Sequence, residues 1–161
     1  MMPHRTTKGM AISIYVLLGL LLPIGSSYGK HKKPDEPPFQ YLYGTEKVDK
    51  GCAGKLEVLK EGLTFRCSNG TFTFPFAAIT LMQYRPDVSD QVLAMKIPWK
   101  EKPQLPRVRE NKYFTVVCGQ QGKLQAAVFR VDENDMRPYF AEIELQSGKS
   151  VQEFRSFGEF N

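Results

Sequence analysis

Apolar and polar residues alternate with a period of two from Gly54 onward, which is the pattern of a half-buried β-strand. Lysine and glutamate occupy the polar positions, and residues 60–62 (Lys-Glu-Gly) interrupt the pattern as a turn would. The apolar positions on either side of this turn are Leu56, Val58, Leu63, Phe65 and Cys67. The pattern predicts a β-hairpin.

A second alternating run covers residues 71–76. Phe72, Phe74 and Phe76 are each separated by one residue, so we expect them to share one face of a strand. Pro75 has no N–H group to donate to a neighbouring strand. This strand is therefore expected at an edge of the sheet or at a bulge.

Further runs rich in β-branched and aromatic residues predict strands at residues 79–84, 92–99, 112–118 and 124–131. Gly119 and Gly122 favour a turn between the last two of these strands. Three prolines fall within residues 98–109, which we therefore expect to form an exposed loop.

The hydrophobic period changes after Val131 from two residues to that of a helix. Met136, Phe140 and Ile143 fall at helical spacing, residues 132–135 offer N-cap side chains, and Gly148 is a typical helix end. We expect Pro138 in the first helical turn, where its missing N–H is tolerated. The fold class is thus predicted as mainly β with one amphipathic C-terminal helix.

The N-terminus has the organisation of a secretory signal peptide over residues 1–29. Three basic or histidine side chains precede an apolar run at residues 10–24, and small residues follow it. A run of about fifteen residues is short for a span of a bilayer, although an uncleaved anchor helix is the alternative. The signal peptide predicts a secreted or periplasmic protein. We expect a Pro/Lys-rich leader at 30–43, whose apolar residues 39–43 lie against the domain, the folded domain at 44–148 and a tail at 149–161.

Three cysteines in an exported protein can form one disulfide and leave one thiol. Cys52 and Cys67 are favoured as the pair, because they lie on the two sides of the predicted hairpin. A turn centred on Glu61 would instead place Cys67 opposite Lys55. The alternative to a disulfide is that all three cysteines, Cys118 included, are reduced and buried.

The order of predicted elements resembles the pleckstrin-homology-like (PH-like) superfold, including GRAM-type modules. The resemblance covers residues 51–151 and is carried by GKLEVLKEGLTFRC, FTFPFAAITLMQY and AAVFRVDENDMRPYFAEIELQSGK. It implies a seven-stranded, antiparallel, partly open barrel capped by the helix. Segments such as ITLMQYRPDVS and KYFTVV also resemble short exported bacterial proteins of unknown function. The basic pattern of phosphoinositide-binding members is not matched, because Glu57 and Glu61 interrupt the lysines of the first hairpin.

Catalytic and cofactor motifs are missing from the sequence. After the signal peptide only one histidine remains, His31, so the predicted domain cannot form a Ser-His, Cys-His or histidine-metal site. Neither a Walker motif nor a G-x-G-x-x-G motif occurs. We expect no enzyme, cofactor or metal. A small carboxylate-dependent hydrolase, using Asp87, Asp90 or Glu101, is the less favoured alternative.

The net charge is +5, and removal of Arg5 and Lys8 with the signal peptide lowers it to +3. This modest charge and the exported location argue against nucleic acid as a partner.

One basic segment, residues 96–112, contains the only tryptophan and is the candidate ligand-binding site. A basic loop with an amphipathic ring suits an anionic lipid headgroup, polysaccharide or protein. A solvated loop with the tryptophan folded back on the barrel is the alternative. The site residues are Lys96, Trp99, Lys100, Lys102, Arg107, Arg109 and Lys112.

These patterns together predict an exported, non-enzymatic binding or scaffold domain that interacts with a protein or with components of the cell envelope. Peripheral binding of an anionic membrane or glycan through residues 96–112 is the alternative. The sequence does not identify the ligand.

Overall fold

The structure is a computed structural model, and it describes residues 38–105 and 113–154. The predicted signal peptide, most of the predicted leader, the end of the tail and the site residues Arg107, Arg109 and Lys112 lie outside the described residues.

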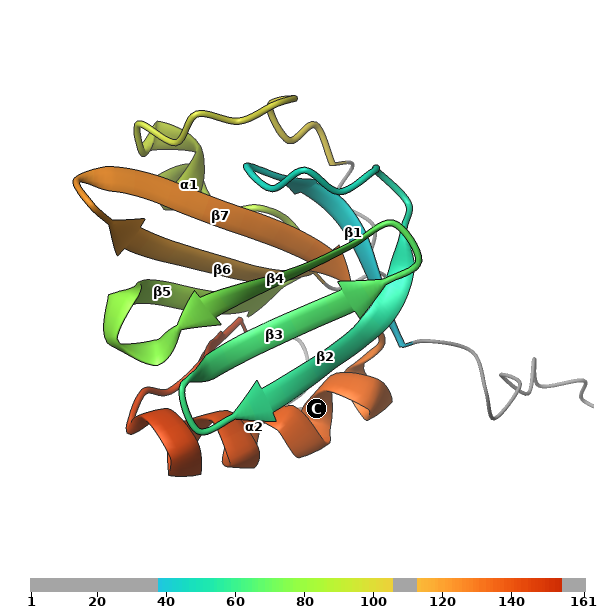
Figure 1. Cartoon of the computed structure of the whole chain (residues 1–161), viewed down its shortest axis with the longest axis vertical. Coiled ribbons are helices and arrows are strands. Elements are labelled where there is room, and N and C mark those ends of the chain that lie inside the picture. Colours follow the sequence, from blue (N-terminus) through green and yellow to red (C-terminus); the bar gives the residue numbers. More distant parts are fainter. Residues whose placement is uncertain (1–37, 106–112, 155–161) are drawn as a thin grey trace, which may run out of the picture. The chain divides into compact units, whose positions relative to one another are not determined.

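The fold is mainly β, with eight strands in one sheet that is not closed. The spatial order is β4-β3-β2-β1-β7-β6-β5-β8 (Figure 1). Neighbouring strands are antiparallel except β5 and β8, which pair in parallel. The strands are β1 (Phe39–Gly44), β2 (Ala53–Leu59), β3 (Gly62–Cys67), β4 (Gly70–Pro75), β5 (Ile79–Arg85), β6 (Tyr113–Gln120), β7 (Lys123–Arg130) and β8 (Gln152–Glu153).

Strand β1 joins the two halves of the sheet. It pairs with β2 near its start and with β7 along most of its length. The sheet bends strongly. Strands β2 and β1 lie between β3 and β7 in the sheet, yet the ring centroids of Phe65 (β3) and Phe129 (β7) are only 4.9 Å apart. Phe39, Phe74 and Phe114 complete the fully buried aromatic core on this inner face.

The outer face of β1 and β5–β7 is also covered. A second hydrophobic cluster there includes Tyr43, Leu81, Val117 and Val128, and Val92 and Ile97 pack on it. Val92 belongs to the short helix α1 (Asp90–Ala94). Because both faces are buried, residues Tyr113–Cys118 of β6 are buried without alternation.

The predicted hairpin is confirmed, with Leu56 opposite Phe65 and a turn at Lys60 and Glu61. The position of Pro75 at an edge is also confirmed, since β4 is an outermost strand. After β4 the chain makes a 3-10 turn, η1 (Phe76–Ala78), before β5.

Two sequence predictions differ from the structure. Residues 39–43 lie against the domain as predicted, but they belong to its central strand β1 and not to a leader, so the domain begins earlier than residue 44. Residues 92–99 do not form a strand. The Ser89 hydroxyl instead accepts a hydrogen bond from the Val92 N–H at 3.3 Å and caps α1.

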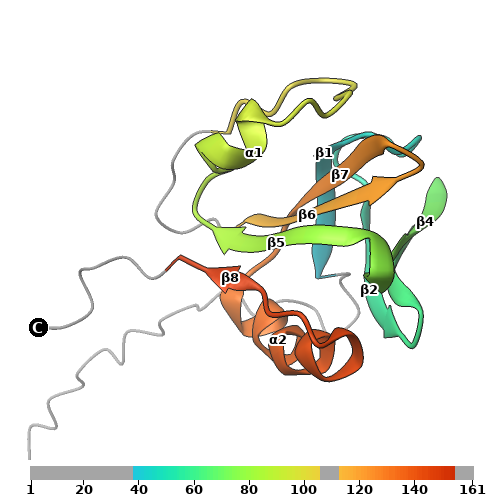
Figure 2. The same cartoon turned by 90° about the vertical axis from the view of Figure 1, so that its left-hand side faces the viewer.

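Helix α2 (Glu133–Ser147) confirms the predicted C-terminal helix. Met136 and Ile143 are fully buried, and Gly148 ends the helix in the left-handed conformation (φ 65°). Pro138 was expected in the first helical turn, but it lies further into the helix, at an exposed position. Ring contacts from Tyr139 to Phe39 and from Phe140 to Tyr84 place α2 across one end of the bent sheet (Figure 2).

Among the described residues, no helix combines the length and the apolar character that crossing a membrane requires.

Candidate functional site

The end of the domain opposite α2 is formed by chain connections. The β1–β2 connection, the β6–β7 turn and the segment that follows α1 lie at the top of Figure 1, whereas α2 lies at the bottom. This arrangement leaves the inner face of the sheet uncovered by a helix at the upper end.

A pocket of about 410 Å³ opens at this end. Its walls are residues 45–48 of the β1–β2 connection, 70–72 at the start of β4, 123–125 at the start of β7, and Pro98. The pocket exists because β1 and β2 separate: after Tyr41, β1 follows β7, while β2 departs with β3. The connection between them therefore spans an opening instead of continuing the sheet.

Thr45 fixes the first wall. Its backbone N–H donates to the Ala126 carbonyl oxygen at 3.0 Å, and its hydroxyl accepts from the Ala126 N–H at 3.2 Å. The preceding Gly44 has no room for a Cβ, which would overlap the Ala126 carbonyl oxygen and the Tyr41 ring. These contacts hold the chain against β7 and place Glu46 on the pocket wall.

Two buried polar groups hydrogen-bond to residues of the pocket wall. The Tyr41 hydroxyl donates to the Glu46 carbonyl oxygen at 3.5 Å, and the Cys118 thiol donates to Gln125 Oε1 at 3.6 Å. Burial, assisted by the negative charge of Glu46, raises the pKa of Tyr41 to about 12 and that of Cys118 to about 11. The thiol is therefore protonated at neutral pH and is a poor nucleophile.

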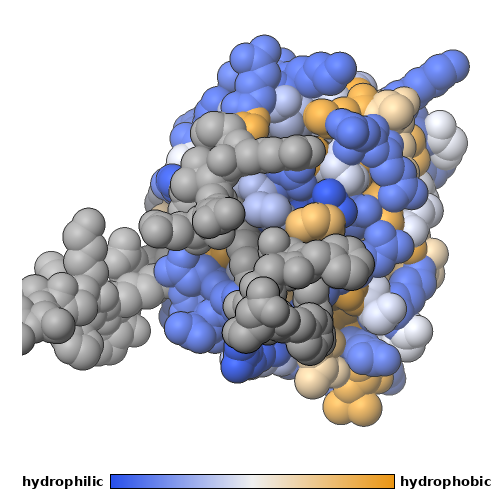
Figure 3. Space-filling view, turned by 180° about the vertical axis from the view of Figure 1, so that it is seen from behind, coloured by the Kyte–Doolittle hydropathy of each residue, from blue (hydrophilic) through white to orange (hydrophobic). Residues whose placement is uncertain are grey.

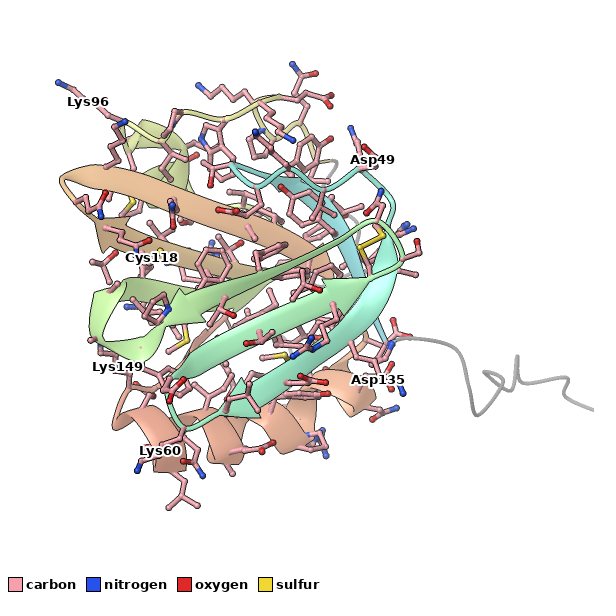
Figure 4. All side chains as sticks on the ribbon, in the orientation of Figure 1. Asp49, Lys60, Lys96, Cys118, Asp135 and Lys149 are labelled. Carbon is pink, nitrogen blue, oxygen red and sulfur yellow. A yellow bond between two sulfur atoms is a disulfide. The ribbon has the colours of Figure 1, made fainter. Side chains whose placement is uncertain are left out.

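The surface around the pocket is basic. Six exposed lysines lie at this end, which we name the basic end, together with the exposed acidic residues Asp49 and Glu101. The lysines are Lys47, Lys50, Lys96, Lys100, Lys102 and Lys123. Figure 4 labels Lys96 at the top of the domain, far from Asp135 in α2. Exposed acidic residues of α2, such as Glu142 and Glu144, lie at the other end. Charges of the opposite sign also occur at each end, since Figure 4 labels Asp49 near the top and Lys60 and Lys149 near α2.

The structure brings together part of the predicted site. Lys96, Lys100 and Lys102 are exposed, and the Lys100 N–H donates to the Gly44 carbonyl oxygen at 3.4 Å. Trp99 does not project into solvent. It packs on the outer hydrophobic cluster, as in the alternative interpretation, and its indole N–H is buried without a hydrogen-bond partner among the described residues.

A disulfide joins Cys52 and Cys67, whose Cα atoms are 6.1 Å apart. The register places Cys67 opposite Gly54, so that Cys52 lies just before the paired part of β2. The Asn69 amide donates to an Asp49 carboxylate oxygen at 2.5 Å beside it. Both links fasten the β1–β2 connection to the β3–β4 turn, and they hold two walls of the pocket together.

The described residues contain no cluster of histidine, cysteine and carboxylate side chains that could hold a metal ion. The carboxylates considered for hydrolysis have cationic neighbours of their own: Asp87 pairs with Arg85 at 3.1 Å and Glu101 with Lys50 at 3.2 Å. Asp90 is exposed in the first turn of α1.

Large hydrophobic side chains that are exposed in the described part of the chain, namely Leu59, Leu145 and Phe154, do not line the pocket. On the face opposite that of Figure 1, the described hydrophobic and hydrophilic residues are interspersed (Figure 3).

Sequence reasoning missed the pocket, and with it Glu46. Its only signal was a pair of charged residues, Glu46 and Lys47, directly after an aromatic run. Nothing in the linear order shows that these residues meet the start of β4 and the start of β7.

Comparisons with known proteins add no family to this description. No protein-family model matches the chain, and a search of curated proteins finds no relative.

Proposed function

We propose that this chain is an exported, non-enzymatic binding domain that binds an anionic component of the cell envelope at its basic end. The observation that carries the proposal is the pocket of about 410 Å³ surrounded by exposed lysines. Pockets of this size suit small molecules or headgroups, and a cluster of like charges attracts partners of the opposite sign. The lysines would attract the anionic partner, and the pocket would give it a specific position.

The order of the strands supports a PH-like fold for this domain. Strands β1–β4 and β5–β7 form two antiparallel meanders that meet where β1 pairs with β7, and the helix lies at one end of the bent sheet. The short parallel strand β8 is an addition to the expected seven strands.

The Cys52–Cys67 disulfide supports export. Disulfides persist in oxidising compartments, which agrees with the apolar run and the small residues at the N-terminus.

The test is binding of the exported protein, purified after expression of the full chain, to anionic partners. Vesicles with phosphatidylglycerol and an acidic polysaccharide would each be compared with a neutral counterpart at low and high salt. We expect retention on an anionic partner at low salt, and its loss as salt rises, because exposed charges are screened.

A matched pair of variants locates the contact. The double substitution Lys100→Glu and Lys102→Glu should abolish retention, whereas Lys55→Glu and Lys60→Glu, at exposed positions of the β2–β3 hairpin, should leave it unchanged. The two anionic partners distinguish a membrane surface from a glycan. Absence of retention on both partners at low salt, or equal effects of both double variants, would overturn the proposal.

A further inference from the structure

Glu46 is a carboxylate without a cationic partner in a pocket with a basic rim. It is partly buried, and the Thr45 hydroxyl lies 3.3 Å from one of its oxygens. Among the described residues no lysine or arginine lies within ion-pair distance of it, although both of its neighbours on the rim, Lys47 and Lys123, are cations. Its carboxylate is therefore available to an ammonium group from outside, and such a charge-assisted hydrogen bond is stronger than a neutral one.

Glu46 is less exposed than the other charged residues of the pocket wall, because its side chain is partly buried. The lysines Lys47 and Lys123 are exposed by contrast, so their charges lie toward solvent. The pocket wall therefore presents one partly buried negative group and two exposed positive groups.

The remaining wall residues suit an ammonium group close to Glu46. The Gln125 side chain lines the pocket, and its carbonyl oxygen can accept a hydrogen bond. Phe72 contributes a partly buried aromatic ring, whose centroid lies 5.8 Å from that of Tyr41. Aromatic faces attract cations, and this attraction adds to the effect of the carboxylate.

We infer that the pocket binds a small zwitterionic group, with its primary ammonium on Glu46 and its anionic part against Lys47 and Lys123. This inference rests on the proposed function and specifies the ligand class for the same end of the domain. It also explains why a carboxylate occupies a pocket whose other charged wall residues are lysines.

The test measures calorimetric binding of three probes to the exported protein at low salt: O-phosphoethanolamine, ethanolamine and inorganic phosphate. We expect O-phosphoethanolamine to bind at least about tenfold more tightly than either of the others, because only it satisfies both charges. Vesicles that contain phosphatidylethanolamine, compared with phosphatidylcholine vesicles, form a second arm. Binding in that arm alone would identify the group as part of a lipid.

Glu46→Gln should weaken binding of O-phosphoethanolamine, or of the phosphatidylethanolamine vesicles, by about tenfold, and it should leave inorganic phosphate unaffected. Glu61→Gln, which changes an exposed carboxylate of the β2–β3 turn, is the matched control and should change nothing. Lys47→Gln with Lys123→Gln should weaken both O-phosphoethanolamine and phosphate. This variant keeps Glu46, so it tests the pocket even if Glu46→Gln lowers the thermal midpoint.

Equal binding of O-phosphoethanolamine and phosphate, unchanged in Glu46→Gln, would overturn the inference and leave the proposed function intact. So would retention on anionic vesicles or glycans without any binding in either zwitterion arm. The absence of all binding, anionic retention included, would overturn both.

Discussion

At the scale of single residues, the pocket depends on how Thr45 ends strand β1. The Thr45 hydroxyl, and not a backbone carbonyl oxygen, accepts the hydrogen bond from the Ala126 N–H, so the chain leaves β7 at this point. Glu46 then reaches the pocket wall without a cationic partner among the described residues, and the buried Cys118 thiol donates to Gln125 of the same wall. The chemistry of both side chains follows from this placement.

Cys118 should resist alkylation in the folded protein. Burial raises the pKa of its thiol from 9.0 to about 11, so at pH 8 the reactive thiolate is about a hundredfold scarcer than in an unperturbed cysteine. We expect iodoacetamide to modify Cys118 slowly at pH 8, with a rate that rises toward pH 11 rather than levelling near pH 9. Mass spectrometry of the intact protein measures this rate.

The control is the same reaction in urea, where unfolding should restore ordinary cysteine reactivity. Fast modification of the native protein at pH 8 would show that the Cys118 thiol is accessible to solvent and would contradict its burial.

At the scale of elements, α2 is held by a narrow set of contacts. Met136 and Ile143 are fully buried two turns apart, while Leu145 of the same helix is 82% exposed. The aromatic residues Tyr139 and Phe140 are only partly buried, although they contact rings of β1 and β5. The packing of α2 on the sheet should therefore depend on the side chains at a few buried positions and not on the overall hydrophobicity of the helix.

Ile143→Ala should lower the free energy of unfolding by about 2 to 5 kcal/mol, because it removes buried methyl groups and leaves a cavity under the helix. Leu145→Ala on the same helix should change it by less than about 0.5 kcal/mol. Urea unfolding followed by circular dichroism measures both values. Similar losses in the two variants would contradict the orientation of α2.

Elements with strong local patterns could be predicted, and those without could not. The β2–β3 hairpin has strict alternation around a turn, and α2 has helical spacing and a terminal glycine, so local rules suffice for both. Residues 92–99 have an apolar run that fits a strand. The Ser89 cap and the burial of Val92 and Ile97 on the outer face of the sheet decide instead for a helical turn followed by an extended segment.

At the scale of the whole molecule, β1 is the strand on which both halves of the sheet depend. It separates the β2–β4 meander from the β5–β7 meander, and Phe39 is fully buried in the core. The basic end and the acidic helix lie at opposite ends of this sheet. Binding at the basic end, as proposed, would therefore place α2 away from the partner.

A chain that begins at Pro38 should keep a cooperative thermal transition, whereas one that begins at Thr45 should lose it. The shorter chain lacks β1, so β2 and β7 lose their hydrogen-bond partner and the core loses Phe39 and Tyr41. Circular dichroism during heating compares the two. A cooperative transition in the shorter chain would show that β1 is dispensable and that the folded domain starts after it.

The sequence by itself determined the fold class, the hairpin, the C-terminal helix and the favoured cysteine pair, because each depends on periodicity or on residues close in the chain. Only the tertiary structure decided that residues 39–44 form the central strand, that Trp99 folds back on the sheet, and that Glu46 lies in a pocket with Lys47 and Lys123. These features arise where β1, β4 and β7 meet. Their residues are up to about eighty positions apart, and no local pattern encodes contacts over that distance.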